Sequence, residues 1–192
     1  GSKTPNTAIY DRIEVVRGAT GLITGAGEPS AAINLVRKHA VSDVFTGSLW
    51  LEAGSWDHYG AGIDASTPLN SSGSVRARFV ADAARQDAFI NLEETQNTIV
   101  YAIVDADLSE NTRLSVGASD QRDDRDGVLW AGPPYWYSDG TRADWGRAQT
   151  TATDWNEWNT RERTVFAALD HTFANLWTLQ VDATHYRQRE ES

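Results

Sequence analysis

The sequence predicts a mainly β protein, and three observations support this fold class. Polar and apolar residues alternate over long stretches, as in strands with one wet and one apolar face. Clusters of turn-forming residues separate these stretches at short intervals. The composition, with 15 glycines and 8 tryptophans among 192 residues, suits strands and turns better than long helices.

Composition also excludes several classes of protein. The chain has no cysteine, so neither a disulfide framework nor a cysteine metal site is possible. Its 17 basic and 27 acidic residues give a net charge of -10, which disfavours nonspecific binding to nucleic acid. No apolar run approaches the roughly 18 residues that a transmembrane helix needs.

The first predicted element is a pair of strands around a glycine-rich stretch. Apolar runs at residues 13–16 and 32–36 flank this stretch. A phosphate-binding loop needs Lys followed by Ser or Thr at a helix start, whereas this chain continues Glu28-Pro29-Ser30. No helical pattern follows, so a dinucleotide-binding unit is excluded as well.

From about Phe45 onward, a period of two predicts six or seven antiparallel strands in a meander. We expect four charged side chains to share the polar face, namely Arg76, Arg78, Asp105 and Asp107. The apolar face is expected to carry Val75, Phe79, Val104, Leu114, Val165 and Leu179.

The connections between these strands alternate in length. Tight turns are predicted at 68–73, 108–112 and 173–177, and longer connections at 87–95 and 123–160. Short turns on one rim and long loops on the other are the plan of an outer-membrane β-barrel. The alternative is a soluble β-rich module that binds carbohydrate or a small molecule through exposed Trp and Tyr, with the apolar faces in a closed core.

Specific stretches then resemble a known family. "YDRIEVVRGATGLITGAGEPSAAINLVRK" resembles the closing part of the plug domain of TonB-dependent ferric-siderophore receptors. "GSLWLEAGSWDHYGAGIDASTPLNSSGSVRARFVA" resembles their first barrel strands, and "DGVLWAGPPYWYSDGTRADWGR" is similar to an extracellular loop region of ferric-coprogen and ferric-pyoverdine receptors. The resemblance implies that residues 1–42 are the C-terminal part of a plug domain. It implies that residues 43–192 are the N-terminal part of a transmembrane β-barrel, which is incomplete in this chain.

The resemblance also implies a function in the bacterial outer membrane. Extracellular loops and the plug apex would bind a ferric siderophore, and TonB would supply the energy for import. The TonB box is expected ahead of residue 1, and about fifteen of the roughly 22 strands are expected beyond residue 192. We therefore expect this chain alone not to transport, and we expect outer-membrane lipid, but no nucleic acid, among its partners.

The expected ligand contacts lie in the long loop and at the plug apex. By resemblance they are Trp130, Tyr135, Trp136 and Tyr137 in the loop, and Gly21, Leu22 and Thr24 in the plug. Aromatic rings bind such a ligand by stacking and apolar contact, although any one of them could instead pack the loop. Iron would be held by the siderophore, so neither a resident cofactor nor a protein metal site is expected. No G-x-S-x-G motif is present, and no enzymatic activity is expected.

Overall fold

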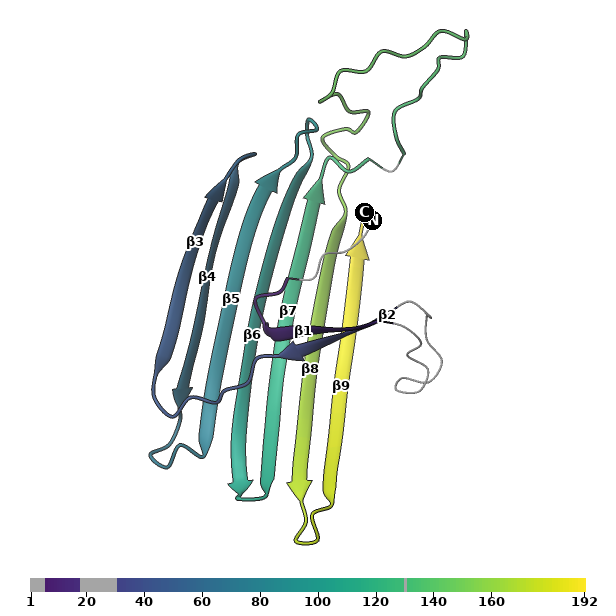
Figure 1. Cartoon of the computed structure of the whole chain (residues 1–192). Helices are drawn as coiled ribbons and strands as arrows, with labels where there is room; N and C mark the ends of the chain where they lie inside the picture. Colours follow the sequence, from purple (N-terminus) through teal and green to yellow (C-terminus); the bar gives the residue numbers. More distant parts are fainter. Residues whose placement is uncertain (1–5, 18–30, 130) are drawn as a thin grey trace.

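The computed structural model describes residues 6–17, 31–129 and 131–192, and within them it contains strands and loops only. No helix in this part of the chain is long and apolar enough to span a membrane. Nine strands form two antiparallel sheets (Figure 1). The small sheet contains β1 (Tyr10–Arg17) and β2 (Ala31–Arg37). The large sheet contains β3 (Thr46–Gly54), β4 (His58–Pro68), β5 (Val75–Asp87), β6 (Glu94–Ser109), β7 (Thr112–Asp126), β8 (Asn159–Thr172) and β9 (Thr178–Glu191).

The large sheet is a meander in chain order, from β3 to β9, and each strand pairs antiparallel with the next. This confirms the predicted topology, with seven strands. The short turns at 69–74, 110–111 and 173–177 lie at one end of the sheet, and the long connection 127–158 lies at the other end (Figure 1). Tight turns enforce this order because they allow only adjacent antiparallel pairing.

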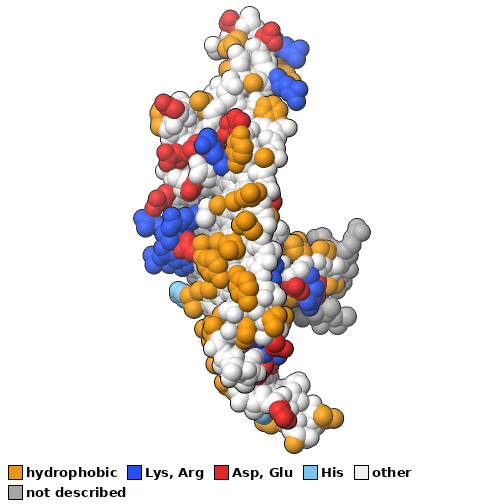
Figure 2. Space-filling model, turned by 90° about the vertical axis from the view of Figure 1, so that its left-hand side faces the viewer, with side chains coloured by type: hydrophobic (Ala, Val, Ile, Leu, Met, Phe, Trp, Pro, Cys, Tyr) orange, Lys and Arg blue, Asp and Glu red, His pale blue; other side chains and the backbone are white. Residues whose placement is uncertain are grey.

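The register gives the large sheet an inner face, toward the small sheet, and an outer face. The six apolar residues expected to share one face do so, because the pairings connect them across the strands. Several are well exposed, including Phe79 at 44% and Val165 at 54%. Figure 2, which views the molecule from the β3 side, shows hydrophobic side chains gathered along its middle. These side chains do not form the closed core that a soluble module would need.

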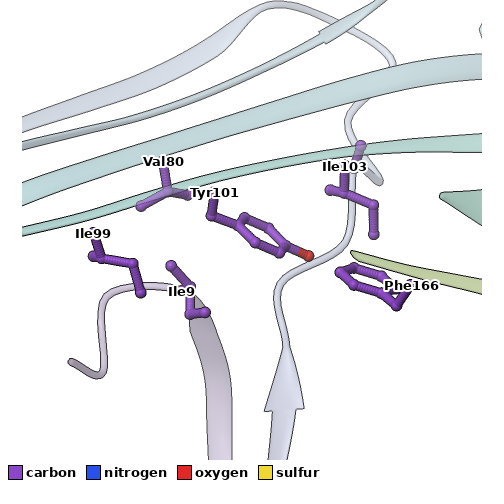
Figure 3. Close-up of a cluster of buried hydrophobic side chains, with 7 residues drawn as sticks. Ile9, Val80, Ile99, Tyr101, Ile103 and Phe166 are labelled. Atoms are coloured by element: carbon purple, nitrogen blue, oxygen red, sulfur yellow. The ribbon is translucent and has the colours of Figure 1, made fainter. Parts of the chain in front are cut away.

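The buried core lies instead between the two sheets. Ile9, directly before β1, and Ala40, shortly after β2, lie at the same end of the small sheet and belong to the buried cluster on the inner face of the large sheet. Around Ile9 lie the buried side chains of β5, β6 and β8 (Figure 3), which are Val80, Ile99, Tyr101, Ile103 and Phe166. The rings of Tyr101 and Phe166 are nearly parallel, with centroids 6.3 Å apart. Arg37 places its guanidinium 4.6 Å from the Phe166 ring centre, a cation–π contact.

Two glycines of the inner face allow aromatic rings to lie against the backbone. Gly117 pairs with Phe166, and a Cβ at this glycine would come within 2.4 Å of the Phe166 ring and 2.9 Å of the Ala102 carbonyl oxygen. Gly62 pairs with Trp50 in the same way, and a Cβ there would come within 2.1 Å of the ring. Any larger residue would displace these rings.

We predict that Gly117→Ala destabilises a full-length protein that contains this segment by about 1–3 kcal/mol, the usual cost of overpacking a core. Gly132→Ala is the matched control, because nothing lies within 4 Å of the added methyl group. Thermal unfolding of both variants, measured by calorimetry, tests the prediction. Equal unfolding temperatures for the two variants would contradict it.

Candidate functional site

The segment that connects the two sheets, residues 38–45, runs against the inner face of the large sheet and is held there by charged groups. Lys38 Nζ lies 2.8 Å from Asp64 Oδ2. Arg78 binds the same carboxylate through two nitrogens, at 2.8 and 2.7 Å, and donates a further bond to the carbonyl oxygen of His39. One carboxylate of β4 therefore joins the connecting segment to β5.

A second carboxylate, Asp105 on β6, is only 2% exposed. Its Oδ2 accepts a hydrogen bond from the Ala40 amide at 2.6 Å, and its Oδ1 lies 2.9 Å from His39 Nδ1. The Ser115 hydroxyl also donates to Oδ1. Arg76 adds a bond from Nε to the Ala40 carbonyl oxygen at 3.0 Å.

The four charged residues expected to share one face therefore do so, which confirms that prediction. Arg76 Nη2 also lies 2.5 Å from Asp107 Oδ2, so the Arg and Asp side chains pair along the inner face as well as with the connecting segment. Arg113 Nε also donates to Asp107 Oδ1 at 2.9 Å, so hydrogen-bond donors occupy the carboxylates of both Asp105 and Asp107.

His39 is the histidine of the connecting segment. The hydrogen bond to Asp105 raises the pKa of His39 above its usual value, because the carboxylate stabilises the imidazolium. Burial opposes this shift. Arg113 on β7 opposes it too, while Asp170 on β8 adds to it.

A second contact between the N-terminal residues and the large sheet lies nearer the end of the sheet that carries the long loop, which we call the outer rim. The Asn6 side-chain amide donates to Asp82 Oδ1 at 2.7 Å and to Asn97 Oδ1 at 2.6 Å. Asp82 Oδ2 in turn accepts a bond from Trp50 Nε1 at 2.8 Å, and Asn97 donates to Asp123. This network spans β3, β5, β6 and β7, and Asn6, Asp82, Asn97 and Asp123 of the network line an open cavity of about 650 Å³.

At the outer rim, three connections meet. Trp56 contacts Phe89 edge to face, with ring centroids 6.5 Å apart, and Arg147 from the long loop lies 5.7 Å from the Phe89 ring centre. The Asn91 amide donates to the Ala148 carbonyl oxygen. These contacts enclose a cavity of about 530 Å³ and fix the base of the long loop.

The tip of the long loop is a small hairpin that presents three of the predicted aromatic residues. Trp136 pairs with Arg142, and the Ala143 amide donates to the Tyr135 carbonyl oxygen at 3.0 Å. The turn contains Gly140 at φ +82°, a conformation that suits glycine. Asp139 Oδ1 accepts bonds from the hydroxyl and amide of Thr141, and these bonds lower the pKa of the Asp139 carboxyl.

This hairpin borders an open cavity of about 870 Å³. Tyr135 lines it and lies under the Arg142 guanidinium at 5.7 Å, while Trp145 donates from Nε1 to the Pro134 carbonyl oxygen. The exposed fractions of the three predicted aromatic side chains are 71% for Tyr135, 61% for Trp136 and 53% for Tyr137. These rings are therefore available to a ligand, and their role as contacts stays a prediction.

The other predicted contacts, Trp130, Gly21, Leu22 and Thr24, lie outside the described residues, and their roles also stay predictions. Within 6–17, 31–129 and 131–192, no group of three or more His, Cys, Asp or Glu side chains is placed to hold a metal ion. The domain boundary at 42/43 likewise stays a prediction, although β3 begins at Thr46.

Sequence reasoning missed the partners of the inner-face charges. Lys38, His39 and Ala40 have no periodic pattern, and three of their contacts with the inner-face charges use backbone atoms, which carry no sequence signal. Asn6 was missed for a similar reason, because a single polar residue before a strand does not identify its partner. The sequence contains one signal for these contacts. Lys38 and His39 are two basic residues directly after an apolar strand, and the strands of the large sheet are rich in Asp.

No protein-family model matches the chain. Among characterised proteins, the ferripyoverdine receptor of Pseudomonas aeruginosa is 43% identical over 186 residues, which is 96% of this chain and 23% of the receptor. The ferric-pyoverdine BN7/BN8 receptor of Pseudomonas putida is 42% identical and is matched over 93% of this chain and 22% of the receptor. The chain thus spans less than a quarter of the length of these relatives.

Solved structures agree with these matches. The outer-membrane ferripyoverdine receptor of Pseudomonas aeruginosa bound to ferripyoverdine superposes with a TM-score of 0.87 and 44% identity, over 94% of this chain and 24% of that structure. The alcaligin outer-membrane receptor FauA of Bordetella pertussis gives a TM-score of 0.74 and 32% identity, over 95% of this chain and 26% of that structure.

We predict that the His39 contact makes attachment of the connecting segment depend on pH. A raised pKa means that the extra stability is fully present below the unfolded value of about 6.5 and is lost as pH rises through the folded pKa. His39→Gln, which cannot gain this charge, should lower the unfolding temperature of a full-length protein more at pH 6 than at pH 9.

The control is His185→Gln, on the outer face and away from the connecting segment. Differential scanning calorimetry at the two pH values provides the measurement. A deficit in the His39 variant that is the same at both pH values would show that the proton on His39 does not contribute.

Proposed function

Because the chain belongs to the family of ferric-siderophore receptors of the outer membrane, we propose that the protein containing it binds a ferric siderophore of the pyoverdine class and imports it. In this proposal the large sheet is part of the barrel wall, and the small sheet belongs to the plug inside it. The relatives are named as receptors, and we propose binding and transport without catalysis.

The aromatic hairpin of the 127–158 loop is the observation that carries the proposal for this chain. The hairpin stands at the end of the sheet opposite the tight turns (Figure 1), where a barrel opens to the outside. Tyr135 and Trp145 line its cavity, together with Arg142 and Asp144. Rings, a cation and a carboxylate around one open space suit a large, polar, partly aromatic chelate.

The plug side of the proposed site is the stretch that contains Gly21, Leu22 and Thr24, together with the polar cavity beside Asn6. Import requires the plug to rearrange, and we propose that TonB drives this through a segment outside this chain. The contacts of Asp64 and Asp105 join the small sheet to the large one, so we propose that any rearrangement of the small sheet has to break them.

We predict that Trp136→Ala in the full-length receptor weakens ferric-siderophore binding roughly threefold to tenfold, because a stacked aromatic ring contributes about 0.5–1.5 kcal/mol beyond its buried area. Trp130→Ala should act in the same direction. Trp155→Ala is the matched control, since this ring is 75% exposed in the same loop but lies outside the hairpin that pairs Trp136 with Arg142. Titration with ferripyoverdine, followed by tryptophan quenching, gives the dissociation constants.

Barrel assembly is checked independently by heat-modifiable migration on gels. Unchanged affinity in both the Trp130 and Trp136 variants, with normal assembly, would assign these rings to loop packing. A loss in the Trp155 variant equal to that in the Trp136 variant would contradict the assignment of the site to the hairpin.

A further inference from the structure

Two carboxylates hold the connecting segment, and their partners differ in chemistry. Asp64 is bound by the ammonium group of Lys38 and by the guanidinium group of Arg78. Lysine and arginine side chains ordinarily carry their charge throughout the range from about pH 5 to pH 9. Asp105 is bound by His39, and an imidazole changes its charge within that range. The connecting segment therefore has one attachment that is constant with pH and a second attachment that titrates.

The charged groups that face His39 come from several strands of the large sheet. Asp105 on β6 lies 2.9 Å from Nδ1 and makes the largest contribution to the raised pKa of His39. Burial and the charge of Arg113 on β7 oppose this shift, and the charge of Asp170 on β8 adds to it. Arg78 on β5 donates to the main-chain carbonyl oxygen of His39 at 3.0 Å. The direct partner of the imidazole is thus a carboxylate, and Arg113 and Asp170 act through their charges.

The same carboxylate also binds the backbone of the connecting segment. Asp105 Oδ2 accepts a hydrogen bond from the Ala40 amide at 2.6 Å, and Arg76 on β5 donates to the Ala40 carbonyl oxygen at 3.0 Å. These contacts form only while the segment lies against the inner face, so they and the His39 contact break together. A proton on His39 therefore stabilises the whole attachment at Asp105.

Protonation of His39 strengthens this attachment. The imidazolium donates a charge-assisted hydrogen bond, whereas the neutral imidazole donates an ordinary one, which is roughly half as strong. Because the hydrogen bond to Asp105 raises the pKa of His39, the attached segment keeps its proton to a higher pH than a detached segment does. The extra attachment is fully present below about pH 6.5 and is lost as the pH rises through the raised pKa of His39.

The titrating attachment lies at the end of the small sheet where the chain both enters and leaves it. Tyr10 pairs with Arg37, so β1 begins where β2 ends (Figure 1). Ile9, directly before β1, is buried in the core between the sheets, and the Lys38 amide donates to its carbonyl oxygen. The contacts before β1 and after β2 therefore meet at one place, and a weaker contact at His39 affects how firmly this end of the small sheet is seated.

We propose that His39 is a proton-controlled latch: at acidic pH its contact with Asp105 keeps the connecting segment seated, and at alkaline pH the small sheet leaves the large sheet more readily. This inference rests on the proposed function, in which the small sheet rearranges during import. It goes beyond an effect on unfolding, because the latch sets how easily the small sheet moves within a folded barrel. The Asp64 attachment persists at both pH values and limits the size of the effect.

The first measurement follows the connecting segment itself. The 192 residues contain no cysteine, so Val41→Cys introduces a single site for a nitroxide spin label in this part of a full-length receptor whose other cysteines, if any, are replaced. Val41 is 66% exposed and directly follows Ala40. Electron paramagnetic resonance of the purified, ligand-free receptor gives the ratio of mobile to immobile label. We expect this ratio to rise about threefold to fivefold from pH 6 to pH 8.5, the difference between a charge-assisted and an ordinary hydrogen bond.

Two substitutions in the labelled receptor fix the charge at position 39. His39→Lys carries a cation at both pH values and should keep the mobile fraction low throughout. His39→Gln is neutral at both pH values and should be as mobile at pH 6 as the labelled receptor is at pH 8.5. His185→Gln, on the outer face of β9, is the matched control and should retain the pH response of the labelled receptor.

Import tests the consequence for transport. Cells take up radioactive iron as ferripyoverdine, and each unlabelled variant is compared with wild type at the same pH, which removes the effect of pH on the energy supply. His39→Lys should import more slowly than wild type at pH 8.5 and equally at pH 6. His39→Gln should import faster than wild type at pH 6 and equally at pH 8.5.

Equilibrium binding of ferripyoverdine, measured in parallel, separates this test from that of the proposed function. Absence of binding by the wild type would contradict the proposed function, whereas normal binding and a mobile fraction that does not change with pH would overturn the latch alone. Equal pH responses in the labelled receptor and in its His39→Lys or His39→Gln variant would also overturn it. The labelled receptor needs no substitution at position 39, so its pH response decides the matter even if those variants fail to assemble.

Discussion

The carboxylate of Asp105 lies almost fully buried in the inner face of the large sheet, and the position of the small sheet depends on it. A buried charge is costly unless hydrogen bonds and counter-charges replace its lost water. The Ser115 hydroxyl supplies one of these bonds, while the Ala40 amide and the His39 imidazole supply the others from the connecting segment. If that segment moved away, Asp105 would keep a single partner. Asp64 likewise binds the connecting segment, through Lys38, and the two carboxylates together join the small sheet to the large sheet.

The same period of two determines which residues lie on the opposite face of these strands. Each inward charge requires an outward neighbour, and in the middle of the sheet these neighbours are Val, Ala and Phe, which suit lipid contact. Toward the long loops the outward neighbours become arginines, so that one strand such as β8 carries an apolar segment and then a basic one. Attachment of the small sheet and the apolar middle of the outer face are therefore two consequences of one alternating pattern.

The alternating pattern also explains how much could be predicted from the sequence. Parity alone placed Arg76 and Asp105 on one face and Phe79 and Val165 on the other, and turn lengths predicted the meander and its two rims. Parity could not identify what the inward charges bind, because the Ala40 contacts involve backbone atoms. The hairpin at the loop tip depends on local turn geometry, which the alternating pattern of the strands does not contain.

Side-chain carboxylates hold the connecting segment against the large sheet, although this segment has no strand pairing of its own. Amide hydrogen exchange of residues 38–43 in the full-length protein tests this attachment. We expect slow exchange at Ala40, whose amide donates to a buried carboxylate, and at Lys38, whose amide donates to the Ile9 carbonyl oxygen. Exchange at both amides as fast as in an unstructured peptide would contradict it.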